Sequence, residues 1–169
     1  KGMTIYRDGS RAGVLLKDEK KKEPETNELQ FHETSAPKRP RVLDAEVLHF
    51  QNDRDKWVAV IGLLDNRPYE IFTGEAEGFF VPNWVKTGQV AKNKLDDINS
   101  RYDFVYTNKY GYKVTMEGLS YQFNTEFWNY AKLISGVLRH GMPIPYVVNL
   151  ISSLSLDNTN INSWKAGVA

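Results

Sequence analysis

The sequence predicts an α+β domain, in which an antiparallel sheet of hairpins is packed on one face by two or three C-terminal helices. Two observations predict the strands: residues 57–72 and residues 102–117 each contain two short β-rich runs joined by a turn. A third predicts the helices, because residues 124–154 contain two amphipathic segments separated by glycine and proline. With 169 residues, of which 41% are hydrophobic, the chain is long enough for one domain with a core.

Composition and charge exclude several classes of function. The 22 basic and 21 acidic side chains nearly cancel, so the net charge of +1 gives no overall attraction to nucleic acid or to an anionic membrane. No apolar run approaches the roughly 20 residues of a membrane-spanning helix, and we find no signal peptide pattern. The chain has no cysteine, which excludes disulfides, thiolate metal sites and cysteine catalysis. The cytoplasm is therefore the default location.

The chain divides into three parts by composition. Residues 1–16 contain the strand candidate Met3–Arg7, which is rich in β-branched and aromatic side chains. Residues 17–41 are mostly charged, contain three prolines and lack an apolar period, which predicts a flexible linker. The lysines at 20–22 could contact phosphates, but a solvated tether interleaved with acidic residues is the favoured interpretation. The folded domain is expected to span residues 42–169.

The first half of this domain predicts a strand followed by a hairpin. Val42–Phe50 is a strand candidate, and Trp57–Leu64 is an almost continuous apolar run, typical of a central strand. Asp65-Asn66 suits a tight turn because both residues tolerate the left-handed conformation, and Tyr69–Phe72 forms the returning strand. Residues 73–83 form a loop with two glycines but lack the spacing of a phosphate-binding loop.

The next three strand candidates are Gly88–Lys94, Tyr102–Thr107 and Tyr112–Glu117, of which the last two form the second hairpin. One face of this hairpin carries an aromatic row with basic residues nearby. Such a row can stack single-stranded bases, or it can pack under the helices, and packing is the favoured interpretation. The row consists of Tyr102, Phe104 and Tyr106, with Arg101, Lys109 and Lys113 as its basic neighbours.

The segment 124–154 predicts a helix, a tight break and a second helix. Asn124 is a good N-cap, and Gly141 is placed to take the left-handed conformation after the first helix. Pro143 and Pro145 fit a linker or a first helical turn. The apolar positions are Phe127, Ala131, Ile134 and Leu138 in the first helix and Ile144, Val147, Val148, Ile151 and Leu154 in the second.

Candidate catalytic and metal-binding residues are few. The histidines His32, His49 and His140 are scattered, without the spacing of a paired metal site. Asp96 and Asp97 are adjacent, and neighbouring positions do not direct two carboxylates at one reacting atom. No set of Ser, His and Asp can be placed together. The sequence therefore predicts no catalytic residue and no metal site within this chain.

Three separated segments resemble one family, the adenosylcobalamin-dependent (class II) ribonucleotide reductases. The opening KGMTIYRDGSR is similar to the segment that closes their catalytic barrel. GLLDNRPYEIF, residues 62–72, resembles the Gly-x-Leu-x-x-x-Pro-Tyr/Phe-Glu-x-Phe hairpin of their small C-terminal domain. Residues 124–154, with LISGVLRHG, resemble the helical signature of that domain. The order and spacing agree, so the resemblance covers nearly the whole chain.

The resemblance implies a parent enzyme that reduces ribonucleotides to deoxyribonucleotides, as a ribonucleoside-diphosphate reductase, for DNA replication. In this family a thiyl radical, generated from adenosylcobalamin, starts the reaction, and a mobile C-terminal cysteine pair re-reduces the barrel cysteines. The chain contains none of these cysteines. Because it starts without methionine and stops within an apolar pattern, we expect a fragment that is itself inactive. Its implied partner is the rest of the reductase chain; a homodimer, and the choice between diphosphates and triphosphates, remain open.

The resemblance also draws attention to Tyr6, Arg7 and Arg11. Reductases that import a radical carry adjacent tyrosines near this segment, whereas Ile5-Tyr6 supplies a single tyrosine, as fits a radical made beside the site. Tyr6 could equally pack at the barrel rim. Arg7 and Arg11 could meet substrate or cofactor phosphates in the parent, or form rim salt bridges.

The leading hypothesis is thus a non-catalytic accessory domain that acts as a docking platform for the mobile tail of the reductase. The alternatives are a stand-alone module that binds single-stranded nucleic acid through the aromatic row, and a protein-interaction module. The near-neutral charge makes nucleic acid the less favoured partner.

Overall fold

The computed structural model describes residues 33, 35–52, 54–79, 81–154 and 159–169. The chain divides into two compact units, Lys1–Thr34 and Ser35–Ala169, and the second contains the described fold. Its strands are β1 (Val42–Asn52), β2 (Asp55–Leu64), β3 (Arg67–Glu75), β4 (Thr87–Lys94), β5 (Ser100–Thr107) and β6 (Lys113–Met116). A 3₁₀ helix, η1 (Leu119–Tyr121), precedes the helices α2 (Thr125–Arg139), α3 (Ile144–Ser153) and α4 (Thr159–Val168).

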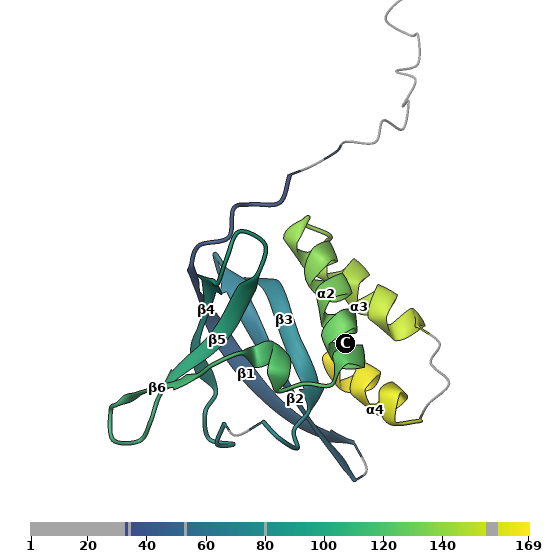
Figure 1. Ribbon diagram of the computed structural model, residues 1–169. Coiled ribbons are helices and arrows are strands. Elements are labelled where there is room, and N and C mark those ends of the chain that lie inside the picture. Colours follow the sequence, from purple (N-terminus) through teal and green to yellow (C-terminus); the bar gives the residue numbers. More distant parts are fainter. Residues whose placement is uncertain (1–32, 34, 53, 80, 155–158) are drawn as a thin grey trace, which may run out of the picture. The chain divides into compact units, whose positions relative to one another are not determined.

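The strands form one antiparallel sheet in the order β3-β2-β1-β4-β5-β6 (Figure 1). The tight turn between β2 and β3 is as predicted: Asp65 and Asn66 have φ values of 51° and 61°, which match the twist of the flanking strands. Strand β2 lies between β3 and β1, so that its run Trp57–Val60 is buried on both faces of the sheet. The continuous apolar pattern therefore identified an interior strand.

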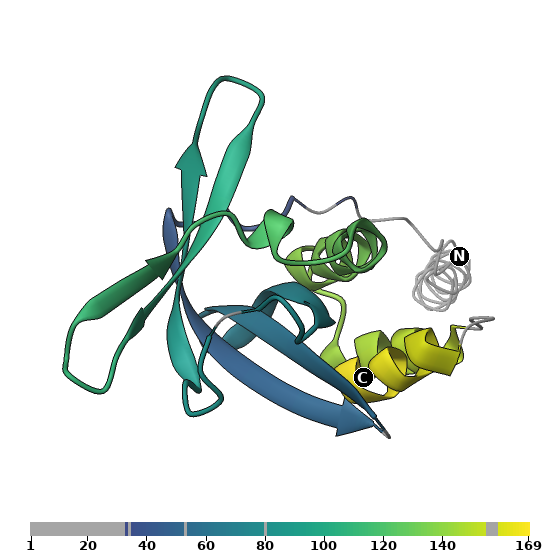
Figure 2. The same cartoon turned by 60° about the horizontal axis from the view of Figure 1, so that its bottom comes forward.

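Each face of the sheet carries its own hydrophobic cluster. The helices α2, α3 and α4 cover one face of the sheet (Figure 2). This face holds Trp57, Ala59 and Ile71, which belong to one hydrophobic cluster with residues of the helices. The opposite face holds Val58, Val60, Phe72 and Phe104 under the loop after β3 and under η1. Hydrophobic burial on both faces fixes the register, since a slip of one residue would exchange the two sets.

The aromatic row of β5 lies on this second face. Phe104 has no exposed surface, and Tyr102 and Tyr106 are partly buried against the same cluster. The row thus packs into the core, as favoured, but mainly beneath Phe79, Val81 and Leu119 from loop and 3₁₀ segments rather than beneath the paired helices. Periodicity could not predict these covering residues, because an irregular segment has no periodic pattern.

The helices follow their sequence signals closely. The Asn124 side chain accepts a hydrogen bond from the Glu126 backbone N–H, and Gly141 has a φ of 78° after the end of α2. The predicted apolar stripe of α2 is buried, and Val147 and Ile151 of α3 are buried beside it. In α4, Trp164 is fully buried and its Nε1–H donates to Thr73 Oγ1 at 3.0 Å.

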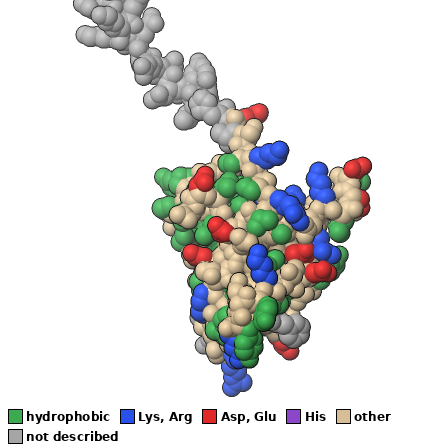
Figure 3. Space-filling view, turned by 90° about the vertical axis from the view of Figure 1, so that its left-hand side faces the viewer, with side chains coloured by type: hydrophobic (Ala, Val, Ile, Leu, Met, Phe, Trp, Pro, Cys, Tyr) green, Lys and Arg blue, Asp and Glu red, His purple; other side chains and the backbone are tan. Residues whose placement is uncertain are grey.

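The α+β class is therefore confirmed: an antiparallel sheet with three C-terminal helices in the described part of the chain. Among the described residues, none of the helices has the length and apolarity needed to cross a membrane. On the side of the molecule shown in Figure 3, basic and acidic side chains are interspersed, which agrees with the balanced composition.

Candidate functional site

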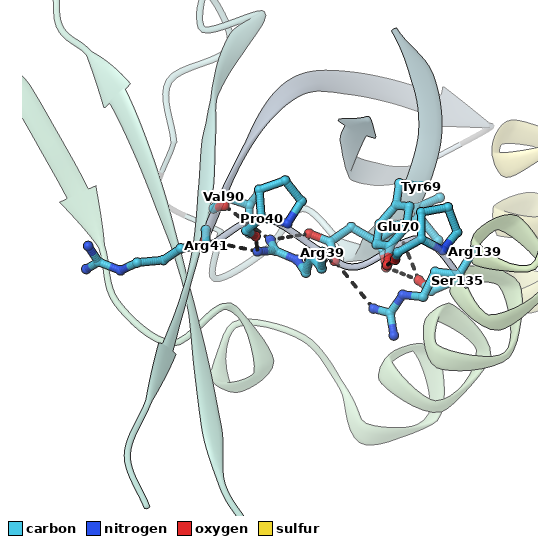
Figure 4. A network of polar contacts seen from close by, with 10 residues as sticks. Arg39, Pro40, Arg41, Tyr69, Glu70, Val90, Ser135 and Arg139 are labelled. Carbon is cyan, nitrogen blue, oxygen red and sulfur yellow. Dashed lines mark hydrogen bonds and ion pairs between the residues drawn. The ribbon is translucent and has the colours of Figure 1, made fainter. Parts of the chain in front are cut away.

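A buried ion-pair network joins the start of the domain to β3 and α2 (Figure 4). Glu70 on β3 is fully buried and accepts two hydrogen bonds from Arg39, Nη2 to Oε1 at 2.6 Å and Nε to Oε2 at 3.0 Å. Arg139 of α2 approaches the same carboxylate at 3.4 Å. Arg39 also donates to the Val90 carbonyl at 3.2 Å. Paired geometry of this kind offsets the large cost of burying a carboxylate.

The small residue opposite Glu70 makes room for this carboxylate. Gly62 on β2 is the cross-strand partner of Glu70. A Cβ atom at Gly62 would lie 2.6 Å from the Glu70 Cγ and 3.0 Å from its Oε1. The glycine and the glutamate of the Gly-x-Leu-x-x-x-Pro-Tyr-Glu-x-Phe segment are therefore linked by packing: the glycine is required because the glutamate rests on it.

The resembling segment 124–154 packs onto the resembling segment 62–72. Strand β3 is an edge strand, and Ser135 of α2 bonds to its outward backbone groups: the hydroxyl accepts from the Ile71 N–H at 3.0 Å and donates to the Ile71 carbonyl at 3.3 Å. Arg67 donates to the carbonyls of Leu138 and Met142, both at 2.7 Å, at the C-terminal end of α2. These bonds satisfy orphan groups of the helix end and cover an edge that would otherwise pair with another chain.

A cleft lies beside this network, between α2 and β3, and we call it the α2–β3 cleft. Its volume is about 240 Å³. Aromatic and aliphatic side chains form most of its walls, and two cations stand among them. The lining residues are Ile71, Phe72, Tyr102, Trp128, Ala131, Lys132, Ser135 and Arg139.

A second buried carboxylate organises the β4–β5–η1 corner. Asp103 accepts bonds from Arg101 Nε at 2.9 Å, Asn93 Nδ2 at 2.7 Å and the Gly118 backbone N–H at 2.9 Å. Burial alone would raise the pKa of Asp103, but the hydrogen bonds from Arg101, Gly118 and Asn93 outweigh burial and hold this pKa below its ordinary value. With all its partners internal, Asp103 is a structural anchor.

The structure describes only some of the candidate residues that the sequence analysis named. Tyr6, Arg7 and Arg11 lie outside the described residues, so their roles stay predictions. His49 lies on β1, where burial, followed by the charge of Lys86, lowers its pKa. Asp96 caps its own turn by accepting from Ile98 and Asn99, as a structural residue. In the part of the chain that the structure describes, no three His, Cys, Asp or Glu residues group as metal ligands do.

Adenosylcobalamin, the cofactor implied for the parent, does not fit the α2–β3 cleft. The α2–β3 cleft holds about 240 Å³, far less than a corrin ring with its nucleotide needs, and no histidine lines it. Within the described ranges we therefore derive no chemical step through this cofactor.

Sequence reasoning missed the residues that organise this region. Arg39 belongs to the charged stretch expected to be a linker, yet its side chain is 7% exposed. A signal existed for Glu70, because a lone glutamate within the apolar run Tyr69–Phe72 needs a buried cation. Nothing in the local pattern showed which of the many arginines would supply it.

Comparison with known proteins agrees with the resemblance. A family model described as "NrdJ homologue C-terminal domain" matches residues 43–169, and NrdJ is the adenosylcobalamin-dependent ribonucleotide reductase. Neither the search of curated proteins nor the search of solved structures returned a match. The match includes the β2–β3 hairpin and the helix α2, whose mutual contacts are described above. Because it spans most of the chain, this protein belongs to the family of NrdJ homologue C-terminal domains.

Proposed function

We propose that this chain is the non-catalytic accessory domain of a larger ribonucleotide reductase, where it acts as a docking platform that holds the mobile C-terminal tail near the catalytic barrel. The parent reduces ribonucleotides in the cytoplasm, as a step in deoxyribonucleotide synthesis. Its radical chemistry uses adenosylcobalamin bound by other parts of the parent. The rest of the parent chain is the partner of this domain.

The proposal rests on one observation: polar side chains of the resembling segments bond to other groups within this domain. Arg67 and Ser135 bond across the contact between β3 and α2, and Glu70 is held by Arg39. A catalytic residue must touch substrate, so its polar atoms cannot all be committed to the fold. Side chains engaged in this way build a rigid scaffold, and a rigid scaffold suits docking.

The alternative of a nucleic-acid module has less support. Stacking of bases on the β5 row requires exposed ring faces, and Phe104 has none. Arg101, one of the row's basic neighbours, is engaged with Asp103 at 2.9 Å. The described residues thus leave the row without the platform that this alternative needs.

The test uses the parent reductase with the residues equivalent to 42–169 deleted and the tail retained. We expect full turnover when a small dithiol is the reductant, because it reaches the barrel without the tail. Turnover with a protein dithiol reductant should fall at least tenfold, because that route needs a positioned tail. Loss with both reductants would show that the domain serves catalysis itself. Unchanged turnover with both would eliminate the docking role.

A further inference from the structure

The α2–β3 cleft differs from the other polar features of the domain because its side chains are not all engaged internally. Lys132 is exposed, and its Nζ lies 5.9 Å from the centre of the Trp128 ring. Arg139 makes one long hydrogen bond to Glu70 at 3.4 Å, since Arg39 already occupies both oxygens, and its guanidinium lies 5.5 Å from the centre of the Tyr69 ring. The Arg139 Nε is buried without a hydrogen-bond partner. Two cations at the cleft therefore have donors to spare.

The walls of the cleft are aromatic. Phe72 and Trp128 stack with ring centres 5.6 Å apart, and Tyr102 lies 5.2 Å from Phe72. Two more cations lie near the Tyr102 ring: Arg39 is 5.6 Å and Lys92 is 5.7 Å from its centre. The cleft thus has an apolar interior and a positive surround.

Charge around the cleft favours an anionic ligand. No acidic side chain is among the described residues that line it. The nearest carboxylate of the network, Glu70, is fully buried and shared between Arg39 and Arg139. Low-dielectric walls beside like charges focus a field that attracts the opposite charge.

Size decides between classes of anion. Pockets for drug-sized ligands and cofactors hold about 300–1,000 Å³, and the α2–β3 cleft holds about 240 Å³. This volume accommodates one large side chain, as in the anchor pockets at the centre of protein interfaces. A whole nucleotide would protrude.

We propose that the α2–β3 cleft is a peptide-docking site, which takes an aromatic or large aliphatic side chain from an acidic segment of a partner polypeptide. The anchor side chain enters the cleft and packs against the ring surfaces of Trp128, Phe72 and Tyr102 that line it. A carboxylate next to it in the peptide pairs with Lys132 and with Arg139, whose one hydrogen bond to Glu70 is long. This inference rests on the proposed docking function, for which it names the site and the chemistry of the partner.

The test is selection of a random heptapeptide display library on the immobilised full-length chain, followed by titration of the selected peptides in solution. We expect enrichment of peptides with one Phe, Trp, Tyr or Leu adjacent to Asp or Glu. The variant Lys132→Glu should weaken their binding at least tenfold. Its matched control is Lys109→Glu, because Lys109 sits over Tyr110 at 5.3 Å in the β5–β6 turn, outside the cleft. Both lysines are exposed, and unfolding temperatures check that both variants fold.

Three outcomes of the peptide selection and titration would overturn the inference. They are no enrichment, enrichment of basic or purely polar peptides, and equal affinity for the Lys132→Glu and Lys109→Glu variants. Preferential binding of a single-stranded oligonucleotide over every selected peptide would also overturn it. None of these outcomes touches the deletion test of the parent enzyme. A domain that docks the tail through another surface would fail the peptide-binding test and still pass the deletion test.

Discussion

The buried pair of Arg39 and Glu70 predicts a large loss of stability for Glu70→Gln. The substitution keeps the volume that rests on Gly62, so packing changes little, but it removes the charge that Arg39 pairs with at 2.6 Å. The Arg39 side chain is 7% exposed, so water cannot replace the lost partner. Removing one partner of a buried ion pair lowers the free energy of unfolding by about 3–5 kcal/mol. The free energy of unfolding of a domain is about 5–15 kcal/mol in total, so this loss is a substantial fraction of it.

Urea denaturation of the full chain measures the effect. The midpoint should fall with the slope unchanged, and the unfolding temperature should drop by about 10–20 °C at this domain size. The matched control is Glu75→Gln, an exposed glutamate on the same strand, which should change the free energy of unfolding by less than about 0.5 kcal/mol. Arg139→Gln should cost about 1 kcal/mol, because Arg139 is 34% exposed and lies farther from the carboxylate. Equal losses for Glu70→Gln and Glu75→Gln would refute the reasoning.

Three further substitutions test other parts of the account. Gly62→Ala should destabilise by about 1–3 kcal/mol through contact with Glu70, and a double-mutant cycle should find a much smaller loss in a Glu70→Ala background. Asp103→Asn should cost about 1.5–3 kcal/mol at pH 7. Because the folded pKa of Asp103 is depressed, its stabilisation is present above the unfolded pKa and lost as pH falls through the folded one, so urea titrations should show the two proteins converging in acid. Ser135→Ala leaves the backbone of Ile71 unpaired on the β3 edge, and should cost about 1–3 kcal/mol in urea titrations and speed hydrogen exchange of the Ile71 amide. A slow Ile71 amide in that variant would contradict the edge-capping role.

The elements of the fold were largely readable from the sequence because their signals are local. The turn at Asp65-Asn66, the cap at Asn124 and the left-handed Gly141 each depend on backbone preferences within a few residues. The apolar run of β2 predicted an interior strand for the same reason.

The candidate site was not readable, because its contacts are distant in sequence. Arg39 and Glu70 are 31 residues apart, and Glu70 and Arg139 are 69 apart. The Phe104 face was expected beneath the helices, but the sheet buries it beneath Phe79 and Leu119. Which irregular segment covers which face depends on the path of the whole chain, and no local preference encodes that path.

The resemblance supplied what local patterns could not, and the structure gives it a physical basis. The segments that carry it, GLLDNRPYEIF and LISGVLRHG, meet across β3 and α2 through Arg67, Ser135 and Arg139. A substitution in one of these segments therefore acts on the other through these contacts.

The size of the native protein tests the central claim most directly. An antibody raised against this chain is used to probe a denaturing gel of extract from the source cells. If the chain is an accessory domain of a reductase, the band will lie at several times its 19.4 kDa. A band at 19.4 kDa would contradict the account, because a free-standing protein of that size has no barrel and no tail to dock.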